Sequence, residues 1–408
     1  MRVPRRPGAG AGVAVAVAAV ATVGLVLSGC SSSGSNTSSN NGAGNGGNNG
    51  SGNNGSAKTV SWSTAQSATA GGGMNALVAA AKKEGTLNVI ALPPSWANYA
   101  EIIATFKKKY GIQIHSENPN GASGDELNAL KSTKGQPSAP DVVDVGNSYA
   151  LEGAQGGLFA PYKVQTWNDI PQGQKDAGGL WTSDYGGYIS IGCNAKKIKK
   201  CPKTIKALDN PSFHNAVALN GDPTSASAGF NGVWAAALAN GGSTSNIQPG
   251  IDFFHKLNQQ GIFNKTDVTP ATEASGATPI VLDWDYLNAG ETPVLAKKGI
   301  KWEVNDPSDG LVSAYYSQAI NINAPHPAAA RLWEEFLYSQ APDGGQNLWL
   351  KGYARPIELP AMIKAGTADK AALKKIPPVH DTHPFLPTQA QITKAQNVVT
   401  QKWSSAVS

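Results

Sequence analysis

The chain has 408 residues, enough for roughly two to three domains of about 150 residues each. Hydrophobic residues make up 40% of it, which can form a sizeable core, and the formal net charge is +5. Without three arginines in the first six residues the net charge falls to +2. This balance excludes a strongly basic nucleic-acid-binding protein and an acidic disordered chain, so we expect no nucleic-acid partner. Three cysteines and six histidines are too few for a disulfide-dense scaffold or a zinc-finger array.

The first thirty residues predict a secretion signal and a lipid anchor. The early arginines are followed by an uncharged stretch, residues 11–27, that is rich in alanine, valine and glycine. Such a stretch favours a cleavable signal over a membrane-spanning helix. It ends in a Leu-Ser-Gly-Cys motif that resembles the lipobox of bacterial lipoproteins. We expect residues 1–29 to be cleaved and Cys30 to carry palmitate-type acyl chains that attach the protein to the membrane. An uncleaved signal anchor is the alternative.

The next segment, residues 30–57, predicts a flexible tether. After the cysteine it consists almost entirely of serine, glycine and asparagine. Such a composition cannot bury apolar surface, so the segment is expected to be disordered. A flexible chain of this length spans on the order of 28 Å.

From about Met74 onward, apolar runs alternate with helical periodicity. Helices are expected over 76–83, 96–110, 125–131, 230–238, 250–259 and 327–339. Strands are expected over 87–92, 112–116, 142–145, 216–219 and 280–284. This order indicates a mostly parallel sheet covered by helices.

Two long extended stretches, 188–193 and 312–322, frame the second group of strands and helices. They indicate an α/β protein of two lobes that are joined by two extended hinge crossings. We expect residues 58–190 and 317–408 to form lobe 1 and residues 191–316 to form lobe 2. Cys193 and Cys201, at the entry to lobe 2, predict a disulfide in an exported protein. A metal pair is the alternative, but further ligands at suitable spacing are missing.

Five segments, in this order and spacing, resemble one known family. They are residues 84–89, 106–112, 123–127, 324–339 and 344–356. Together they resemble the extracellular solute-binding proteins of ABC importers, in particular the group that includes polyamine-, ferric-iron- and aminophosphonate-binding proteins. The resemblance covers about residues 80–400. It implies the type II periplasmic-binding-protein fold, a small solute held between the lobes, and a membrane permease with its ATPase as partners.

Candidate site residues follow the predicted strands, because ligands of open α/β sheets bind beyond the carboxyl ends of strands. Trp96 and Tyr99 resemble the aromatic pair of polyamine-binding proteins, and each ring attracts an organic cation by about 0.5–2 kcal/mol. Packing in the core is the alternative for Tyr99. Ser123 stands at a helix start, where it either caps the helix or leaves the amides to bind an anion.

Three further residues resemble ligand contacts of polyamine-binding proteins. Ser148 and Tyr149 follow one strand, and Asp222 follows another. The second acid expected three residues after Asp222 is replaced by Ser225, so the chain departs from the polyamine pattern at this point.

The cluster Asp283-Trp284-Asp285-Tyr286 ends a predicted strand. Two acids are costly to bury without a partner, and an ammonium group suits a carboxylate beside an aromatic ring. Alternation along the strand places the two rings on one face and the two acids on the other. The alternative is an aspartate that caps the following helix and a tryptophan in the core.

The two crossings carry further aromatic residues. Trp181 and Tyr188 flank the first crossing and are candidates for the cleft. Tyr315 and Tyr316 lie on the second, and their tandem resembles the iron-ligating pair of ferric-binding relatives, although it is off register. Neighbouring strand residues point to opposite faces, so one of the two is expected in the core. Arg355 could pair an anion, but a structural salt bridge is favoured.

The sequence therefore predicts a lipid-anchored, extracytoplasmic capture protein, expected to be a monomer without a cofactor or metal. Its two lobes close on a small polar solute, with a polyamine-like cation as the first candidate. Aminophosphonate or ferric iron, and a receptor role without transport, are the alternatives. An enzyme is not expected, because the folded part shows neither a G-x-S-x-G nor an H-E-x-x-H motif. The pair His380 and His383 lies in a proline-rich stretch that is expected to be a solvated loop.

Overall fold

A computed structural model describes residues 61–378 and 385–408. The predicted signal peptide, Cys30, the tether and the loop that contains His380 and His383 lie outside these residues. The chain from residue 58 onward forms one compact unit. Within the described ranges, no helix combines the length and hydrophobicity needed to cross a membrane.

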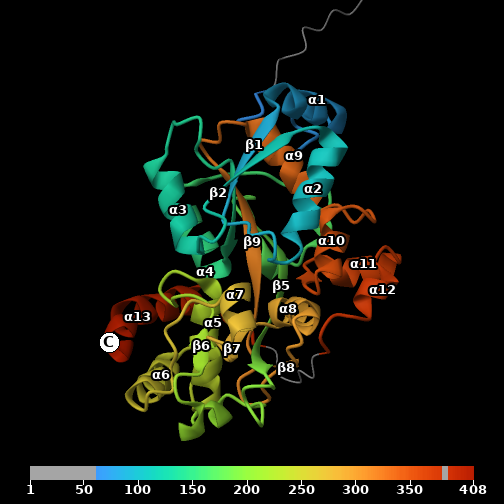
Figure 1. Ribbon diagram of the computed structural model, residues 1–408. Coiled ribbons are helices and arrows are strands. Elements are labelled where there is room, and N and C mark those ends of the chain that lie inside the picture. The colour runs from blue at the N-terminus through green and yellow to red at the C-terminus, as the bar shows by residue number, and fades with distance from the viewer. Residues whose placement is uncertain (1–60, 379–384) are drawn as a thin grey trace, which may run out of the picture. The chain divides into compact units, whose positions relative to one another are not determined.

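Helices and strands alternate along the described chain (Figure 1). The helices are α1 (Met74–Glu84), α2 (Tyr99–Tyr110), α3 (Ser123–Ser132), α4 (Asn147–Gln155), α5 (Ser227–Ala239), α6 (Gln248–Gln259), α7 (Pro270–Ser275), α8 (Asp285–Lys297), α9 (Pro327–Leu337), α10 (Gly345–Lys351), α11 (Leu359–Ala365), α12 (Lys370–Leu373) and α13 (Gln389–Val407). The strands are β1 (Thr86–Ile90), β2 (Gln113–Glu117), β3 (Val142–Gly146), β4 (Phe159–Ala160), β5 (Thr182–Asn194), β6 (Val217–Leu219), β7 (Ile280–Trp284), β8 (Trp302–Asn305), β9 (Ser313–Asn321) and β10 (Arg355–Pro356).

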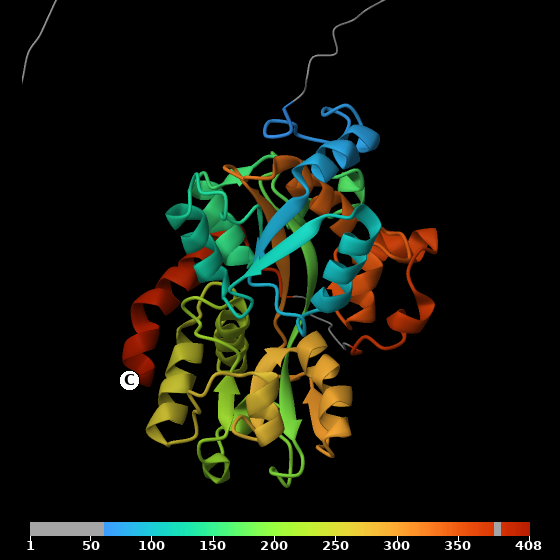
Figure 2. The same cartoon turned by 45° about the horizontal axis from the view of Figure 1, so that its top comes forward.

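The two predicted crossings are the long strands β5 and β9. The main sheet has the order β3-β9-β5-β7-β6, so these two strands lie at its centre. The first part of β5, residues 182–188, pairs with β9, and the following residues 189–193 pair with β7. Figures 1 and 2 both show β5 and β9 running from the group that contains α1, α2 and α9 to the group that contains α5, α7 and α8. The two lobes therefore share one continuous sheet.

The expectation of a mostly parallel sheet is wrong. Parallel pairing occurs between β1 and β2, which form a separate two-stranded sheet, and between β6 and β7. The central strands β5 and β9 are antiparallel to each other, and β3, β7, β8 and β10 pair antiparallel with one of them. The chain returns through the middle of the sheet when it crosses between lobes, and this return imposes the antiparallel pairing.

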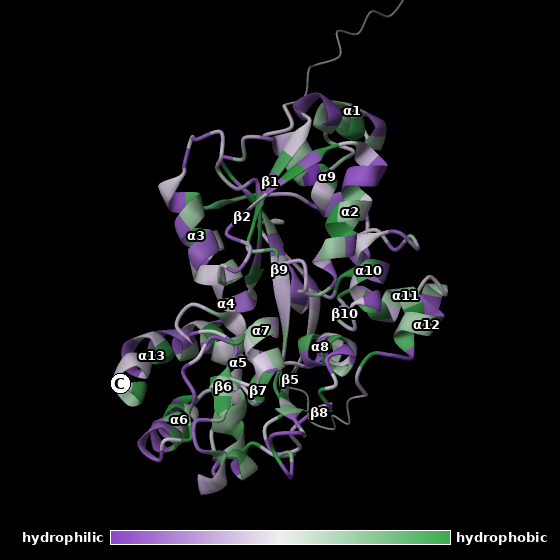
Figure 3. Cartoon of the chain, in the orientation of Figure 1, coloured by the Kyte–Doolittle hydropathy of each residue, from purple (hydrophilic) through white to green (hydrophobic). Residues whose placement is uncertain are grey.

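The cores follow from the sequence pattern. Strands β6 and β7 are buried along their whole length and are coloured as hydrophobic in Figure 3. Helix α5 is rich in alanine and glycine and is buried on nearly all sides, which lets neighbouring elements approach closely. An added Cβ on Gly250 of α6 would lie 2.0 Å from the carbonyl oxygen of Val233, so only glycine permits this approach.

Most predicted elements are confirmed, but the expected start of order near Met74 is wrong. Residues 61–73 form turns in which Ala65 and Ala68 are buried. The guanidinium of Arg331 holds this segment, because its Nε donates to the carbonyl oxygen of Ala65 at 2.7 Å. The predicted disulfide between Cys193 and Cys201 is confirmed. The sequence analysis missed helices α4, α7 and α10 to α13.

Candidate functional site

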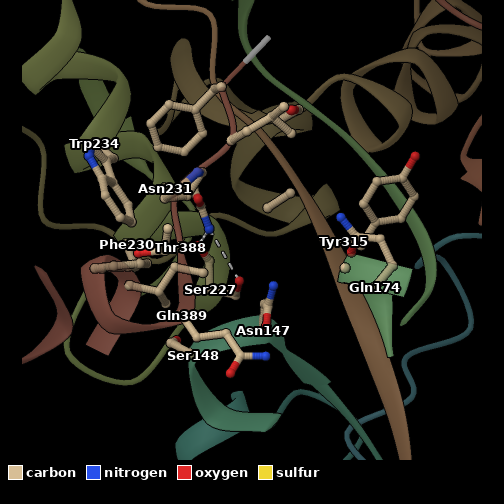
Figure 4. A pocket seen from close by; sticks show the side chains of 17 residues that line it. Asn147, Ser148, Gln174, Ser227, Phe230, Asn231, Trp234, Tyr315, Thr388 and Gln389 are labelled. Atoms are coloured by element: carbon tan, nitrogen blue, oxygen red, sulfur yellow. Dashed lines mark hydrogen bonds between the residues drawn. The ribbon is translucent and has the colours of Figure 1, made fainter. Parts of the chain in front are cut away.

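A cavity of about 370 Å³ lies beside the crossing strand β9, between the starts of helices α4 and α5. Its walls come from parts of the chain that are far apart in sequence (Figure 4). Helix α4 contributes Asn147 and Ser148, and helix α5 contributes four residues. The lining residues are Asn147, Ser148, Gly173, Gln174, Ser227, Phe230, Asn231, Trp234, Ser313, Ala314, Tyr315, Phe385, Leu386, Pro387, Thr388, Gln389 and Ile392.

The lining combines neutral polar groups with aromatic rings. Amide and hydroxyl side chains such as Asn231, Gln174 and Thr388 can both donate and accept hydrogen bonds. Phe230, Trp234 and other rings supply flat apolar surface. Among the described lining residues no side chain is formally charged at neutral pH. The cavity can therefore bind an uncharged polar molecule that also has an apolar face.

The first residues of two helices line this space. Asn147 is the first residue of α4, and Ser227 is the first residue of α5. The first amides of a helix lack partners within the helix and carry a partial positive charge. The side-chain oxygens Asn147 Oδ1 and Ser148 Oγ are buried and make no hydrogen bond within the described residues.

Asn231 is held rigidly in the cavity wall. Its Nδ2 donates to the backbone oxygen of Ser227 at 2.9 Å and to Ser227 Oγ at 3.4 Å, as the dashed line in Figure 4 indicates. The side chain is 6% exposed. Since these contacts fix the carboxamide group, its Oδ1 is a preorganised acceptor for a donor group of a solute.

Of the predicted site residues, Ser148 and Tyr315 line this cavity. Tyr316, the neighbour of Tyr315, is buried and stacks on Tyr185 with ring centroids 5.7 Å apart. The prediction that one of the two tandem tyrosines belongs to the core is confirmed. Within the described part of the chain, no group of three or more His, Cys, Asp or Glu side chains could hold a metal ion.

Trp284 and Tyr286 pack in a buried aromatic cluster instead of lining the cavity. Their rings stack with centroids 6.2 Å apart, so they lie on the same side, as predicted. Trp96 contacts the ring of Tyr286 edge-on, and its Nε1 donates to the hydroxyl of Tyr185 at 2.7 Å. Trp284 and Tyr286 are each 1% exposed, so their rings stabilise the join between the lobes.

Tyr99 lies in the hydrophobic core, as its alternative interpretation states. Its hydroxyl donates to Asp144 Oδ2 at 2.7 Å, and the hydroxyl of Tyr185 donates to the same oxygen at 2.9 Å. Burial raises the pKa of Asp144 to about 6, although both tyrosine hydroxyls oppose the shift. Trp181, on the first crossing, is also buried.

The two acids of the 283–286 cluster are engaged away from the cavity. Asp285 Oδ2 accepts from Arg355 Nη1 at 2.6 Å, which confirms the predicted structural salt bridge of Arg355. Asp285 Oδ1 accepts from the backbone amide of Tyr188 at 3.0 Å, and the ring of Tyr188 lies under the guanidinium. Asp283 is buried and accepts from the backbone amide of Trp284, and burial raises its pKa to about 7. Neither carboxylate lines the cavity.

Three other candidates connect elements next to the cavity. Ser123 Oγ accepts from the backbone amide of Gly146 at 3.0 Å and so joins α3 to the end of β3. The hydroxyl of Tyr149 donates to the backbone oxygen of Thr224 at 2.7 Å, which links α4 to the turn before α5. The exposed Asp222 accepts from the amide and hydroxyl of Thr224 and orders the same turn.

Several lining residues were missed by the sequence analysis. Asn231 gives a signal that could have found it, because it is a polar residue inside a helix that is otherwise almost wholly apolar. Gln174 gives none, because it lies outside any strand or helix end that the predicted sheet defines. Thr388 does give one, because with Gln391 it forms the capping box that begins α13.

Comparisons with known proteins show to which family the chain is related. The family described as bacterial extracellular solute-binding protein matches residues 138–380. No curated protein matches the sequence significantly.

Three solved structures are similar to this one. AfuA from Actinobacillus pleuropneumoniae, with exogenous fructose-6-phosphate bound, has a TM-score of 0.62 at 18% identity and covers 79% of this chain and 98% of its own. A periplasmic thiamin binding protein has a TM-score of 0.62 at 18% identity and covers 79% of this chain and 96% of its own. Iron-bound HitA from Pseudomonas aeruginosa has a TM-score of 0.57 at 21% identity, covering 78% and 99%. The predicted type II periplasmic-binding-protein fold is confirmed.

Proposed function

The chain belongs to the family of bacterial extracellular solute-binding proteins, and from this premise we propose which solute it captures for import through an ABC permease. The proposed solute is small, polar and uncharged, such as a sugar or a nucleoside. One observation supports this choice. The cavity lining consists of neutral hydrogen-bonding side chains and aromatic rings, without a charged side chain among the described residues.

The size and the chemistry of the cavity agree with this solute class. A volume of about 370 Å³ lies at the lower end of the range of ligand pockets, about 300–1,000 Å³. Hydroxyl and amide groups of a solute would pair with Asn231, Gln174 and Gln389, while its apolar face would pack on Phe230 or Tyr315. A polyamine-like cation has less support, because Asp285 is paired with Arg355 and neither Asp283 nor Asp285 lines the cavity.

A second candidate is a solute of the same kind that carries one anionic group. The observation that favours it is the position of the helix starts at Asn147 and Ser227, because helix N-termini stabilise negative charge. A phosphorylated sugar or an aminophosphonate would place its anionic group there. The iron alternative has little support, since Tyr316 is buried in the aromatic cluster and only Tyr315 lines the cavity.

Capture would involve closure of the two lobes about β5 and β9. We propose lobe 1 as residues 58–190 with residues 317–378, and lobe 2 as residues 191–316. The lobes touch beside the cavity, where the amide of Gly124 donates to the backbone oxygen of Ser225 at 3.1 Å. A solute that contacts both lobes stabilises the closed form and shifts the population toward it. The permease would then recognise that closed form, and the protein would bind its solute without catalysis.

The location outside the cytoplasm follows from the family. The lipid anchor remains a proposal that rests on the lipobox-like motif at Cys30 and on the glycine- and asparagine-rich segment after it. In this proposal the protein acts as a monomer that is tethered to the membrane next to its permease.

A thermal-shift screen of the purified full chain tests the proposed solute class. The panel contains maltose and adenosine as neutral solutes, glutamine as a zwitterion, putrescine and spermidine as amines, and glucose 6-phosphate and 2-aminoethylphosphonate as anionic solutes. A ligand at one hundred times its Kd stabilises the folded state by about 2.7 kcal/mol, so we expect a clear shift for at least one neutral solute. A shift with amines alone would contradict the proposed class. A shift with anionic solutes alone would favour the helix N-termini.

A further inference from the structure

The cavity is completed by a part of the chain outside the family match, which ends at residue 380. Phe385, Leu386, Gln389 and Ile392 line the cavity together with their neighbours. These residues form the lead-in and the first turn of helix α13, the last helix of the chain. The end of the chain thus contributes to a site whose other walls belong to the matched region.

Helix α13 lies across both lobes. In Figures 1 and 2 it runs from beside α4 to beside α6. The hydroxyl of Thr388 caps the start of the helix by accepting from the backbone amide of Gln391. In return, Gln391 Oε1 accepts from the backbone amide of Thr388. Gln391 Nε2 also donates to Ser245 Oγ at 2.7 Å, which attaches the first turn to the loop before α6. This arrangement holds the lead-in over the cavity.

The attachment to lobe 2 is apolar and extensive. Trp403 packs edge-on against Phe254 at 5.5 Å and Phe263 at 5.9 Å between ring centroids. At the other end, Phe385 packs against Trp234 at 5.0 Å. Two hydrogen bonds between α13 and α6 add to this apolar packing. His255 Nδ1 donates to the carbonyl oxygen of Ala406, and Lys402 Nζ donates to Gln248 Oε1, both at 2.7 Å.

The side-chain hydrogen bond between α13 and helix α4 of lobe 1 is long. Gln396 Nε2 donates to the hydroxyl of Tyr149 at 3.3 Å, and its Oε1 is buried without a partner in the described residues. Burial of aromatic rings contributes far more to an interface than one long neutral hydrogen bond. Helix α13 is therefore fixed to lobe 2, although the chain reaches it from lobe 1.

We propose that residues 385–408 form a strap that moves with lobe 2 and that its lead-in determines solute specificity. This inference rests on the proposed function, because it assigns the strap a role at the same cavity. Leu386 would be the main specificity contact. It lines the cavity and is 71% exposed, so its side chain contributes little to the packing of the protein. An exposed leucine at a cavity rim can instead pack on a bound solute.

The first test compares Leu386→Ala with Ile363→Ala by titration calorimetry on the full chain. Ile363 is a matched control, because it is 54% exposed and lies on α11, away from the cavity. Maltose and adenosine are the probes. We expect Leu386→Ala to change the Kd of at least one of them at least five-fold, with an unchanged melting temperature, whereas Ile363→Ala leaves every Kd unchanged. Equal Kd values in both variants would overturn the specificity role.

The second test needs no solute and so separates failure of the strap from failure of the proposed function. Hydrogen–deuterium exchange is measured on the full chain and on Trp403→Ala. We expect exchange in α6, residues 248–259, to become at least ten-fold faster, while α4 changes less than two-fold. Faster exchange in α4 with α6 unchanged would overturn the attachment to lobe 2. If Trp403→Ala unfolds, Gln396→Ala serves instead, and the strap predicts unchanged exchange in α6.

Discussion

Replacing Gly146 with alanine would test whether the two lobes touch closely beside the cavity. Gly146 ends β3 and precedes α4, with backbone angles φ −60° and ψ 153° that any residue can adopt. An added Cβ would lie 2.3 Å from Ser227 Oγ and 2.4 Å from Ser227 Cβ at the start of α5. Ordinary van der Waals contact begins at 3.4 Å, so the neighbours must separate by about 1 Å. The substitution therefore acts as a wedge between α4 and α5.

The magnitude follows from the cost of overpacking. Extra methyl groups in a well-packed site cost about 1–3 kcal/mol, and the lower entropy of the unfolded alanine variant offsets about 0.4–1 kcal/mol of this. We expect Gly146→Ala to lose about 1–2 kcal/mol of unfolding free energy, measured by urea denaturation. Because Asn147 and Ser227 line the cavity next to the wedge, we also expect about a tenfold weaker affinity for the captured solute.

Matched variants make the test specific. Gly290→Ala on α8 would place its Cβ where no atom lies within 4 Å, so that variant should be as stable as the wild type or more so. In the Gly146→Ala background, Ser227→Gly removes both clashing atoms and should restore stability, whereas Ser227→Ala keeps the Cβ clash and should not. If Gly146→Ala were as stable as Gly290→Ala, the close contact between the helix starts would be refuted.

Three further predictions concern stability. Burial, aided by the charge of Glu335, raises the pKa of Glu334 to about 8, so the contribution of Glu334 to stability is present at low pH and is lost as the pH rises through about 8. In urea denaturation, Glu334→Gln should therefore be about as stable as the wild type at pH 5 and more stable than it at pH 9. An equal effect at both pH values would contradict this. Converting Cys193 and Cys201 to serine opens a short loop and should lower the free energy of unfolding by about 2–3 kcal/mol, measured by calorimetry. An unchanged free energy of unfolding would show that the disulfide does not stabilise the protein. Asp285→Asn breaks a buried ion pair with Arg355 and should lower the free energy of unfolding by about 3–5 kcal/mol. A double variant that also carries Arg355→Met should recover part of this free energy.

Much of the fold could be predicted from local sequence pattern. The strand at residues 280–284 is a buried apolar run and lies where the pattern places it. The predicted crossings 188–193 and 312–322 coincide with the second half of β5 and with β9, although β5 begins six residues earlier. Helix α13 was missed although a signal exists. Thr388 and Gln391 form a capping box, and Ile392, Ala395, Val399 and Trp403 follow at helical spacing. The other positions of α13 are mostly glutamine, threonine and serine, so the helix contains few apolar residues and its helical spacing is not apparent from their number alone.

The candidate site was predictable only in part. The expectation that ligands bind beyond strand ends selected Asp285, but its partner Arg355 lies 70 positions later in the chain and engages the carboxylate. Local sequence carries no information about that pairing. The cavity instead lies at the starts of α4 and α5 and under the lead-in of α13. These segments are far apart in the sequence and are brought together by the crossings, so their proximity is a property of the whole fold.

The central claim is that the solute binds in this cavity and contacts Asn231. The most direct measurement is titration calorimetry of the panel solute with the largest thermal shift, on wild type, Asn231→Ala and Asn240→Ala. Asn240, the C-cap residue of the same helix, is a matched control, because its Nδ2 also donates to the backbone oxygen four residues earlier, at 2.8 Å, and it lies outside the cavity. We predict at least a tenfold weaker affinity for Asn231→Ala and wild-type affinity for Asn240→Ala. Equal affinity of all three proteins would contradict the assignment of the solute to this cavity.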